Sequence, residues 1–315
     1  MHETFPFRFR DNQVKTRGCN MDSRRRVYSM CFMRKAFFLL LAMSAFTVPA
    51  MAANRIEVHG HRGARALRPE NTIPAFEYAI AEGVDVLELD TGITKDGIVV
   101  VSHDPILHPP VCSGPKPSAV IHDHTLAELR EFDCGAVRNP LFARQQTVPG
   151  TRIPTLDEVL ALGSKGTFRF NIETKISPLH PELTAGPEEF TSKLLGVIRK
   201  HHLEKRVIIQ SFDFRTLHEM KKLAPEIELS ALYEGTSDKS FVAIAKEAGA
   251  GIISPQFPLV TPEKVQAAHA AGLKVVPWTA NTPADWDKLI AAGVDAIISD
   301  DPAALIAHLK SKGVR

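Results

Sequence analysis

The sequence has no hydrophobic run long enough to cross a bilayer comfortably. Its apolar stretch at residues 36–48 has about 13 residues, whereas a membrane-spanning helix needs about 20. Linker-like and low-complexity stretches are also absent after residue 54. These two absences predict a single globular domain over residues 54–315, with no stable membrane insertion of that part.

An excess of basic residues is lacking too, once the N-terminal part is set apart. The whole chain carries 38 Lys and Arg against 36 Asp and Glu. Residues 1–52 hold nine of the bases and three of the acids, which leaves a formal net charge of −4 in residues 53–315. A mildly acidic body of this kind gives no indication of nucleic-acid binding.

Cysteine is scarce, with four residues in 315. After residue 53 there remain Cys112 and Cys134, and both fall in one irregular stretch. In an oxidising compartment they could form a disulfide, and two free buried thiols are the alternative. No cysteine follows the apolar stretch closely enough for a lipid-anchored N-terminus.

The apolar stretch has the features of a secretory signal peptide at residues 33–53. Arg34 and Lys35 precede it, and "AMA" at residues 50–52 fits the small residues of a cleavage site. We therefore expect cleavage near Ala52 or Ala53 and a secreted protein.

The segment 1–32 is unusual in front of a signal peptide. A start codon assigned too early, with Met33 as the true start, explains this leader best. An uncleaved membrane anchor is the alternative.

Eight apolar segments alternate with helical segments, and several helices end in Ala and Gly just before the next strand. Strands that are apolar on both faces are typical of a buried parallel sheet. Eight such units in about 260 residues predict an α/β fold, a TIM (β/α)8 barrel. The expected strands are residues 55–60, 84–90, 168–174, 206–212, 228–233, 251–255, 274–279 and 296–300.

One segment departs from this alternation directly after the second strand. Asp96-Gly97 is a strong hairpin signal, so residues 98–103 should fold back antiparallel as a β-hairpin arm. Residues 104–150 then form an insertion, in which residues 124–132 should make a short helix. Insertions of this length are more often functional than idle.

Acidic residues stand at the ends of two expected strands, where a barrel places its active site. Glu88 and Asp90 are two residues apart on one strand, so both point to the same face. Glu173 lies at the end of the next barrel strand. Carboxylates that converge on one barrel mouth stay ionised only around a cation, and oxygen-only ligands favour Mg²⁺ or Ca²⁺ over Zn²⁺.

Two histidines stand at strand ends and suit acid-base catalysis. His61 ends the first strand and His103 ends the hairpin. Imidazole titrates near neutrality, so one ring can accept a proton while the other donates one. His59 lies deeper in the first strand, where a hydrogen-bonded core role is expected instead.

Positive side chains near the expected metal indicate a phosphoryl ligand. Arg62 and Lys175 would contact a phosphate ester together with the cation. Glu70 and Asn71 begin the first helix, where they could hold Arg62, bind substrate hydroxyls or simply cap the helix. Trp278 could form an apolar wall for a small polyol or pack in the core.

The ordered motifs resemble the glycerophosphodiester phosphodiesterase family over about residues 56–310. The motifs are "HRG" with "PENT", "ELD", "TKDG" before "VVSHDP", "IPTLDEVL", "NIETK", "QSF", "WTAN" and "GVDAIISDDP". The resemblance implies a TIM barrel with one divalent cation. It also implies hydrolysis of deacylated phospholipids, such as glycerophosphocholine or glycerophosphoethanolamine, to glycerol 3-phosphate and an alcohol.

The resemblance also implies roles for individual residues within these motifs. The resemblance implies that His61 and His103 are the acid-base pair and that Trp278 lies near the glycerol. In the same way, it implies metal ligation by Glu88, Asp90 and Glu173, and phosphate contact by Arg62 and Lys175. Gln210, in "QSF", replaces the commoner serine and is expected at the substrate.

The insertion resembles that of exported bacterial members, which favours a periplasmic location and Ca²⁺ over Mg²⁺. Two other functions stay open at this point. A related barrel phospholipase acting on intact lipid should expose apolar residues on its rim loops, and the loop at 108–118 is polar and Pro-rich. A secreted metal- or phosphate-binding protein without turnover would need no pair of histidines. The residues leave the oligomeric state, the preferred alcohol and the attacking oxygen undetermined.

Overall fold

The computed structural model describes residues 55–315. The expected leader at 1–32 and signal peptide at 33–53, with its cleavage site, lie outside the described residues. No helix in the described part is both long and apolar enough to traverse a lipid bilayer.

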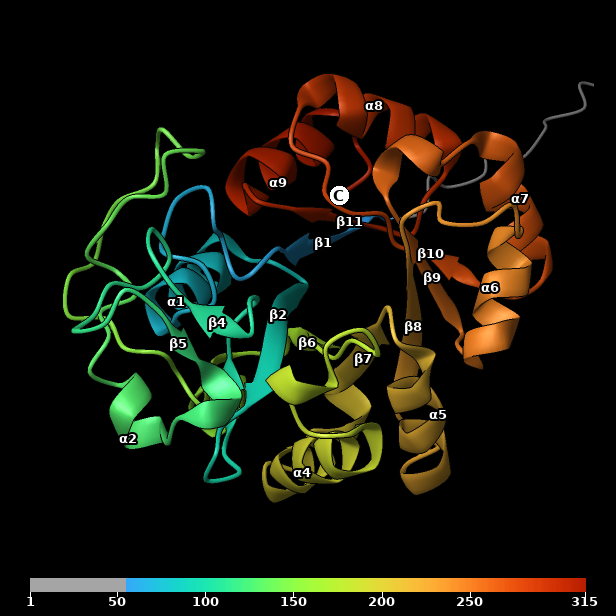
Figure 1. The fold of residues 1–315 in the computed structure, drawn as a ribbon. Coiled ribbons are helices and arrows are strands. Elements are labelled where there is room, and N and C mark those ends of the chain that lie inside the picture. The colour runs from blue at the N-terminus through green and yellow to red at the C-terminus, as the bar shows by residue number, and fades with distance from the viewer. Residues whose placement is uncertain (1–54) are drawn as a thin grey trace, which may run out of the picture. The chain divides into compact units, whose positions relative to one another are not determined.

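Eight parallel strands form the barrel in the centre of Figure 1. The sheet runs in the order β10-β9-β8-β7-β6-β2-β1-β11. Backbone bonds from Asp295 N to Val275 O (3.1 Å) and from Ile298 N to Pro277 O (3.0 Å) join its two ends. The barrel strands are β1 (Glu57–Gly60), β2 (Val86–Ile93), β6 (Arg169–Thr174), β7 (Val207–Ser211), β8 (Glu228–Tyr233), β9 (Ile252–Pro255), β10 (Lys274–Val275) and β11 (Ala296–Ser299).

The strand expected over residues 274–279 is regular only at Lys274–Val275. Pro277 has no N–H to donate to a ladder, which ends the regular strand early. Val276 N and Trp278 N still donate to Ile253 O and Pro255 O, at 2.9 and 3.1 Å, so the segment stays attached to β9.

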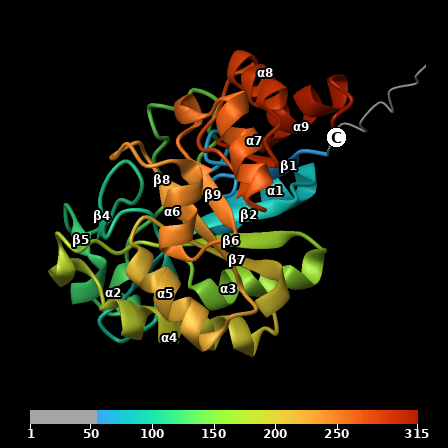
Figure 2. The same ribbon diagram turned by 90° about the vertical axis from the view of Figure 1, so that its right-hand side faces the viewer.

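Helices form the outer layer around the barrel, which Figure 2 shows from the side. Capping residues begin several of these helices: Thr155 and Glu158 form a capping box, and Thr261 and Thr282 cap helices that begin with proline. The helices are α1 (Ile73–Glu82), α2 (Leu126–Leu129), α3 (Leu156–Ala161), α4 (Pro187–Lys200), α5 (Phe214–Leu223), α6 (Phe241–Ala248), α7 (Pro262–Ala270), α8 (Pro283–Ala292) and α9 (Pro302–Ser311). Short 3₁₀ turns are η1 (Ile121–Asp123), η2 (Leu162–Lys165), η3 (Pro181–Leu183), η4 (Glu204–Arg206) and η5 (Phe257–Leu259).

The main core lies between the helices and the outer face of the barrel, where Phe76, Phe170 and Phe190 are fully buried. A smaller apolar cluster fills the barrel itself and includes Ile208, Ile252, Val276, Ala296 and Ile298. This packed interior leaves the mouth of the barrel as the place for polar groups.

His59 lies in the core, as expected, but the prediction that it is hydrogen-bonded there is wrong. The side chain is 1% exposed, and neither ring nitrogen has a hydrogen-bond partner among the described residues. Glu57 Oε2 lies 4.0 Å from its Nε2, while Arg169 holds the same oxygen at 2.8 Å. Burial lowers the pKa of His59 to about 3, and the charge of Arg169 adds to this effect.

A hairpin and the insertion follow β2. Strand β3 (Val99–Val101) pairs antiparallel with the end of β2, and Gly97 occupies the turn with φ of +77°. The insertion contains β4 (Ile106–Leu107), β5 (Ala119–Val120) and α2. Its helix covers Leu126–Leu129 rather than the whole of residues 124–132, because Thr125 caps its start and Arg130 ends it.

A disulfide between Cys112 and Cys134 links two parts of the insertion. Around it lies a separate apolar cluster that includes Leu107, Leu129 and Phe132. The insertion therefore has its own small core beside the barrel (Figure 1).

Candidate active site

The carboxyl ends of the barrel strands surround a cavity of about 320 Å³. Most of the site residues expected from the sequence line it, and Glu70 and Asn71 lie directly beside it. The lining residues are His61, Arg62, Arg65, Glu88, Asp90, His103, Glu173, Lys175, Gln210, Phe212, Leu232, Glu234, Trp278, Thr279 and Ile298.

Three carboxylates expected to hold a metal converge in this cavity. Glu88, Asp90 and Glu173 each offer an oxygen, and these oxygens lie within 4.8 Å of one another. Glu88 and Asp90 are two residues apart on β2, so their side chains point to the same face of the sheet. On the neighbouring strand β6, Glu173 is the register partner of Asp90. All three side chains are buried.

Burial and mutual repulsion make this arrangement costly without a cation. Loss of water raises the pKa of Glu88, and the charges of Asp90 and Glu173 raise it further. Burial likewise raises the pKa of Glu173, although Lys175 Nζ lies 2.8 Å from its Oε1. A bound divalent cation would relieve both effects.

Asp90 is held as an anion. Burial acts to raise its pKa, but His103, Arg62 and Lys175 together lower it below the ordinary value. Arg62 Nε lies 3.4 Å from its Oδ2, and Asn71 Nδ2 donates to the same oxygen at 2.8 Å.

The charges of the site leave a deficit of two positive charges. Five buried carboxylates face three cationic side chains in and around the cavity when the histidines are neutral, counted without the exposed Glu234 and the half-buried Asp104. The carboxylates are Glu70, Glu88, Asp90, Glu173 and Asp300, and the cations are Arg62, Arg65 and Lys175. One divalent cation balances this set, and an all-oxygen ligand set suits Mg²⁺ or Ca²⁺.

His61 is oriented by a carboxylate that the sequence analysis did not select. Asp300 Oδ1 lies 2.5 Å from its Nδ1, and Asn281 Nδ2 donates to Asp300 Oδ2 at 2.7 Å. Burial lowers the pKa of His61, and Asp300 opposes part of that shift. The position of Asp300 at the end of the last strand was the signal that could have identified it.

His103 follows β3 and reaches the same cavity from the hairpin. Its Nδ1 lies 2.7 Å from Asp104 Oδ1, and this hydrogen bond is the main cause that lowers the pKa of Asp104 to about 2. Both histidines thus have Nδ1 bound to a carboxylate, which leaves Nε2 for a substrate.

Arg62 and Asn71 hold unusual backbone conformations in the loop between β1 and α1. Their φ angles are 49° and 55°, in the left-handed region that non-glycine residues seldom adopt. Glu70 Oε1 lies 2.5 Å from Arg62 Nη1, so Glu70 holds this guanidinium, which is one of the roles expected from the sequence. Gly63 is required between them, because a Cβ there would lie 2.7 Å from the carbonyl carbon of Ala75.

Arg65 is a second cavity arginine, and the sequence analysis gave it no role. Its Nε lies 3.2 Å from Glu70 Oε2 and 3.8 Å from Asp300 Oδ1. The ring of Phe142, from the insertion, covers its guanidinium at 4.8 Å. The insertion therefore helps to form this side of the cavity.

Trp278 and Phe212 form an aromatic wall on the other side. Their rings meet edge to face with centroids 5.6 Å apart, and the Trp278 indole N–H donates to Ser254 O at 2.8 Å. Gln210, expected at the substrate, is 1% exposed on the cavity floor and donates to Glu88 Oε1 at 2.8 Å.

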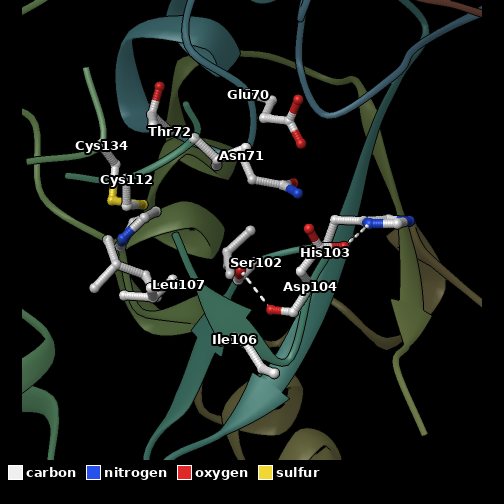
Figure 3. Close-up of a pocket in the computed structure, with 14 residues that line it drawn as sticks. Glu70, Asn71, Thr72, Ser102, His103, Asp104, Ile106, Leu107, Cys112 and Cys134 are labelled. Carbon is white, nitrogen blue, oxygen red and sulfur yellow. Dashed lines mark hydrogen bonds and ion pairs between the residues drawn. A yellow bond between two sulfur atoms is a disulfide. The ribbon is translucent and has the colours of Figure 1, made fainter. Parts of the chain in front are cut away.

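A much smaller cavity of about 20 Å³ lies behind His103. In Figure 3 the disulfide lies at one end of it and His103 at the opposite end. Glu70 and Asn71 line it as well, so the insertion packs directly behind the loop that carries the site. Its volume is that of about one water molecule.

Comparison with known proteins shows which family has this site. The family model for the glycerophosphoryl diester phosphodiesterase family matches residues 61–304. A glycerophosphodiester phosphodiesterase of Caldanaerobacter subterraneus is 38% identical over 257 residues, which cover 81% of this chain and 98% of that protein. One from Bacillus subtilis is 32% identical over 290 residues, covering 84% and 94%.

Solved structures agree with these relatives. A chain from Silicibacter pomeroyi, whose structure bears the name of the same family, has a TM-score of 0.77 and 31% identity and covers 82% of this chain and 95% of its own length. A phosphodiesterase of Oleispira antarctica, solved with its product sn-glycerol-3-phosphate, has a TM-score of 0.70 and 25% identity and covers 81% and 97%. The TIM barrel expected from the sequence is confirmed, and the chain belongs to the glycerophosphoryl diester phosphodiesterase family.

Proposed function

We propose that this phosphodiesterase hydrolyses deacylated phospholipids to glycerol 3-phosphate and an alcohol, with one divalent cation and two histidines. The observation that carries the proposal is the convergence of three carboxylates, two arginines, a lysine and two carboxylate-bound histidines on one cavity. A related phosphodiesterase was solved with sn-glycerol-3-phosphate, which supports this product.

The three carboxylates at the cavity floor fit a divalent cation. Glu88, Asp90 and Glu173 would hold it, because they offer only oxygen ligands and the charges of Asp90 and Glu173 act against ionised Glu88. When bound, the cation would withdraw charge from the phosphoryl oxygens. Ca²⁺ is the favoured ion because of the resemblance to exported bacterial members.

The remaining side chains suit a phosphodiester. Arg62 and Lys175 direct positive charge at the cavity while Glu70 and Glu173 hold them in place. His61 is kept neutral by burial and is suited to accept the proton of the attacking oxygen. His103, bound to Asp104, would then protonate the leaving alkoxide.

Export of the protein belongs to the same proposal. Residues 33–53 have the pattern of a signal peptide, and a disulfide in the insertion suits an oxidising compartment such as the periplasm. The domain would then begin near residue 54.

The alternatives are weaker on this structure. Membership of an enzyme family speaks against a binding protein without turnover. The loop at 108–118, which is fully described, exposes no large apolar side chain, which speaks against a phospholipase acting on intact lipid. Leu179 after β6 and Phe212 after β7 are exposed apolar side chains that follow the carboxyl ends of barrel strands, and they speak for it.

The proposal is tested with His61→Ala and His103→Ala, measured on glycerophosphocholine. Each variant should fold and lose kcat by about 10²–10⁴-fold, the usual contribution of a general acid or base. His218→Ala, on the outer helix α5, is the matched control and should keep full activity. Near-normal turnover in either site variant would contradict the assignment.

A further inference from the structure

A row of three buried polar side chains leads from Glu88 into the barrel wall. Gln210 Nε2 donates to Glu88 Oε1 at 2.8 Å, and Asn171 Nδ2 donates to Gln210 Oε1 at 2.8 Å. The three residues come from β2, β7 and β6 and are 1–2% exposed. Asn171 does not line the cavity; it lies beside Glu88 in the register of β2 and β6, and its side chain donates to Gln210 rather than to Glu88.

The second oxygen of the Glu88 carboxylate is held as well. The backbone N–H of Arg62 donates to Oε2 at 2.8 Å, from the residue with the left-handed φ of 49°. Each carboxylate oxygen therefore has one protein donor. Since the donors come from β7 and from the loop between β1 and α1, the plane of the carboxylate is fixed before any ligand arrives.

The direction of the Gln210 amide matters for this arrangement. Because Asn171 donates to its carbonyl oxygen, the amide NH₂ is the group that faces Glu88. The opposite orientation would set a carbonyl oxygen against a carboxylate oxygen, which repel each other. Asn171 thus determines which end of Gln210 meets the carboxylate.

Asn171 makes little other contribution through polar contacts. Its own carbonyl oxygen is buried and has no hydrogen-bond partner among residues 55–315. A buried amide with an unsatisfied oxygen is unfavourable for folding. The hydrogen bond that Asn171 donates to Gln210 is therefore the polar contact that explains an amide at this buried position.

We propose that Gln210 and Asn171 are positioning residues that hold Glu88 in the orientation needed to bind a divalent cation. This role rests on the proposed metal site, and it differs from the substrate contact expected of Gln210. The cation is the ligand affected, and Asn171 acts on it across two hydrogen bonds.

Calorimetric titration of the chelator-treated full chain with CaCl₂ or MgCl₂ tests this role without using activity. Gln210→Met keeps the side-chain length and removes the donor, and it should weaken metal binding about 10–100-fold. Asn171→Val should also weaken metal binding. In the double variant, the valine should add no further loss, because its effect passes through Gln210.

Ser230→Ala is the matched control, because Ser230 is an equally buried polar residue on β8 that bonds Ser254 instead of the site. Its metal affinity should equal that of the unmodified protein. Metal binding by the unmodified protein with unchanged affinity in folded Gln210→Met and Asn171→Val variants would overturn the positioning role alone. Absence of metal binding by the unmodified protein would overturn the proposed metal site and this role together.

Discussion

Replacing His59 with leucine should make the protein more resistant to acid. The imidazole is 1% exposed, and its two nitrogens have no hydrogen-bond partner in the described chain. Its pKa is about 3 in the fold and about 6.5 when the chain is unfolded. As the pH falls through this interval, the unfolded chain binds a proton that the folded protein does not bind, so stability is lost.

The size of the effect follows from these two pKa values. One proton bound only by the unfolded chain lowers the free energy of unfolding by up to about 1.4 kcal/mol for each pH unit. Between pH 7.5 and pH 4.5 the loss is therefore about 2.7 kcal/mol. His59→Leu removes this loss, and it also removes two unsatisfied buried atoms, which should add ~1–3 kcal/mol at pH 7.5.

Urea unfolding at pH 7.5 and pH 4.5 measures the difference directly. The advantage of His59→Leu over the unmodified protein should grow by about 2.7 kcal/mol at the lower pH, because all other groups titrate alike in both proteins. Exposed His180, replaced by Gln, is the control and should change stability by less than ~0.5 kcal/mol at both values. An equal advantage of the leucine variant at the two pH values would refute the assignment of His59 as a buried neutral imidazole.

Two further predictions concern the support of His61, one of the two proposed catalytic histidines, and the disulfide of the insertion. Asp300→Asn removes the carboxylate that binds His61 Nδ1, and it should lower kcat on glycerophosphocholine about 10²-fold while the circular dichroism spectrum stays unchanged. Replacing Cys112 and Cys134 with Ala together opens a loop of sequence separation 22, and it should lower the free energy of unfolding by about 3 kcal/mol in urea titrations. Full activity of the first variant, or unchanged stability of the second, would contradict these roles.

The barrel was predictable because its signals are local. Apolar segments marked all eight strands, and several of the helices between them end in Gly just before the next strand. The site could be located for a related reason, since residues at strand ends meet at the mouth of any such barrel. The early end of β10, which is regular only at Lys274–Val275, was not predicted, although Pro277 in the sequence indicated it.

Contacts between distant segments could not be predicted in this way. The stacking of Phe142 on Arg65 joins the insertion to the first loop, and the row from Glu88 through Gln210 to Asn171 joins three strands. Sequence spacing determines which face of a strand a residue occupies, but it does not determine which neighbour across the barrel it will meet. These tertiary contacts therefore needed the structure.

The most direct test of the central claim is product release by the metal-stripped protein. The purified chain would be treated with chelator and incubated with glycerophosphocholine, and glycerol 3-phosphate would be followed while Ca²⁺ or Mg²⁺ is added back. Our account predicts no release without metal, and restored release with a divalent cation, Ca²⁺ being the more effective. Release at full rate in the stripped protein, or none with either ion while the protein stays folded, would contradict it.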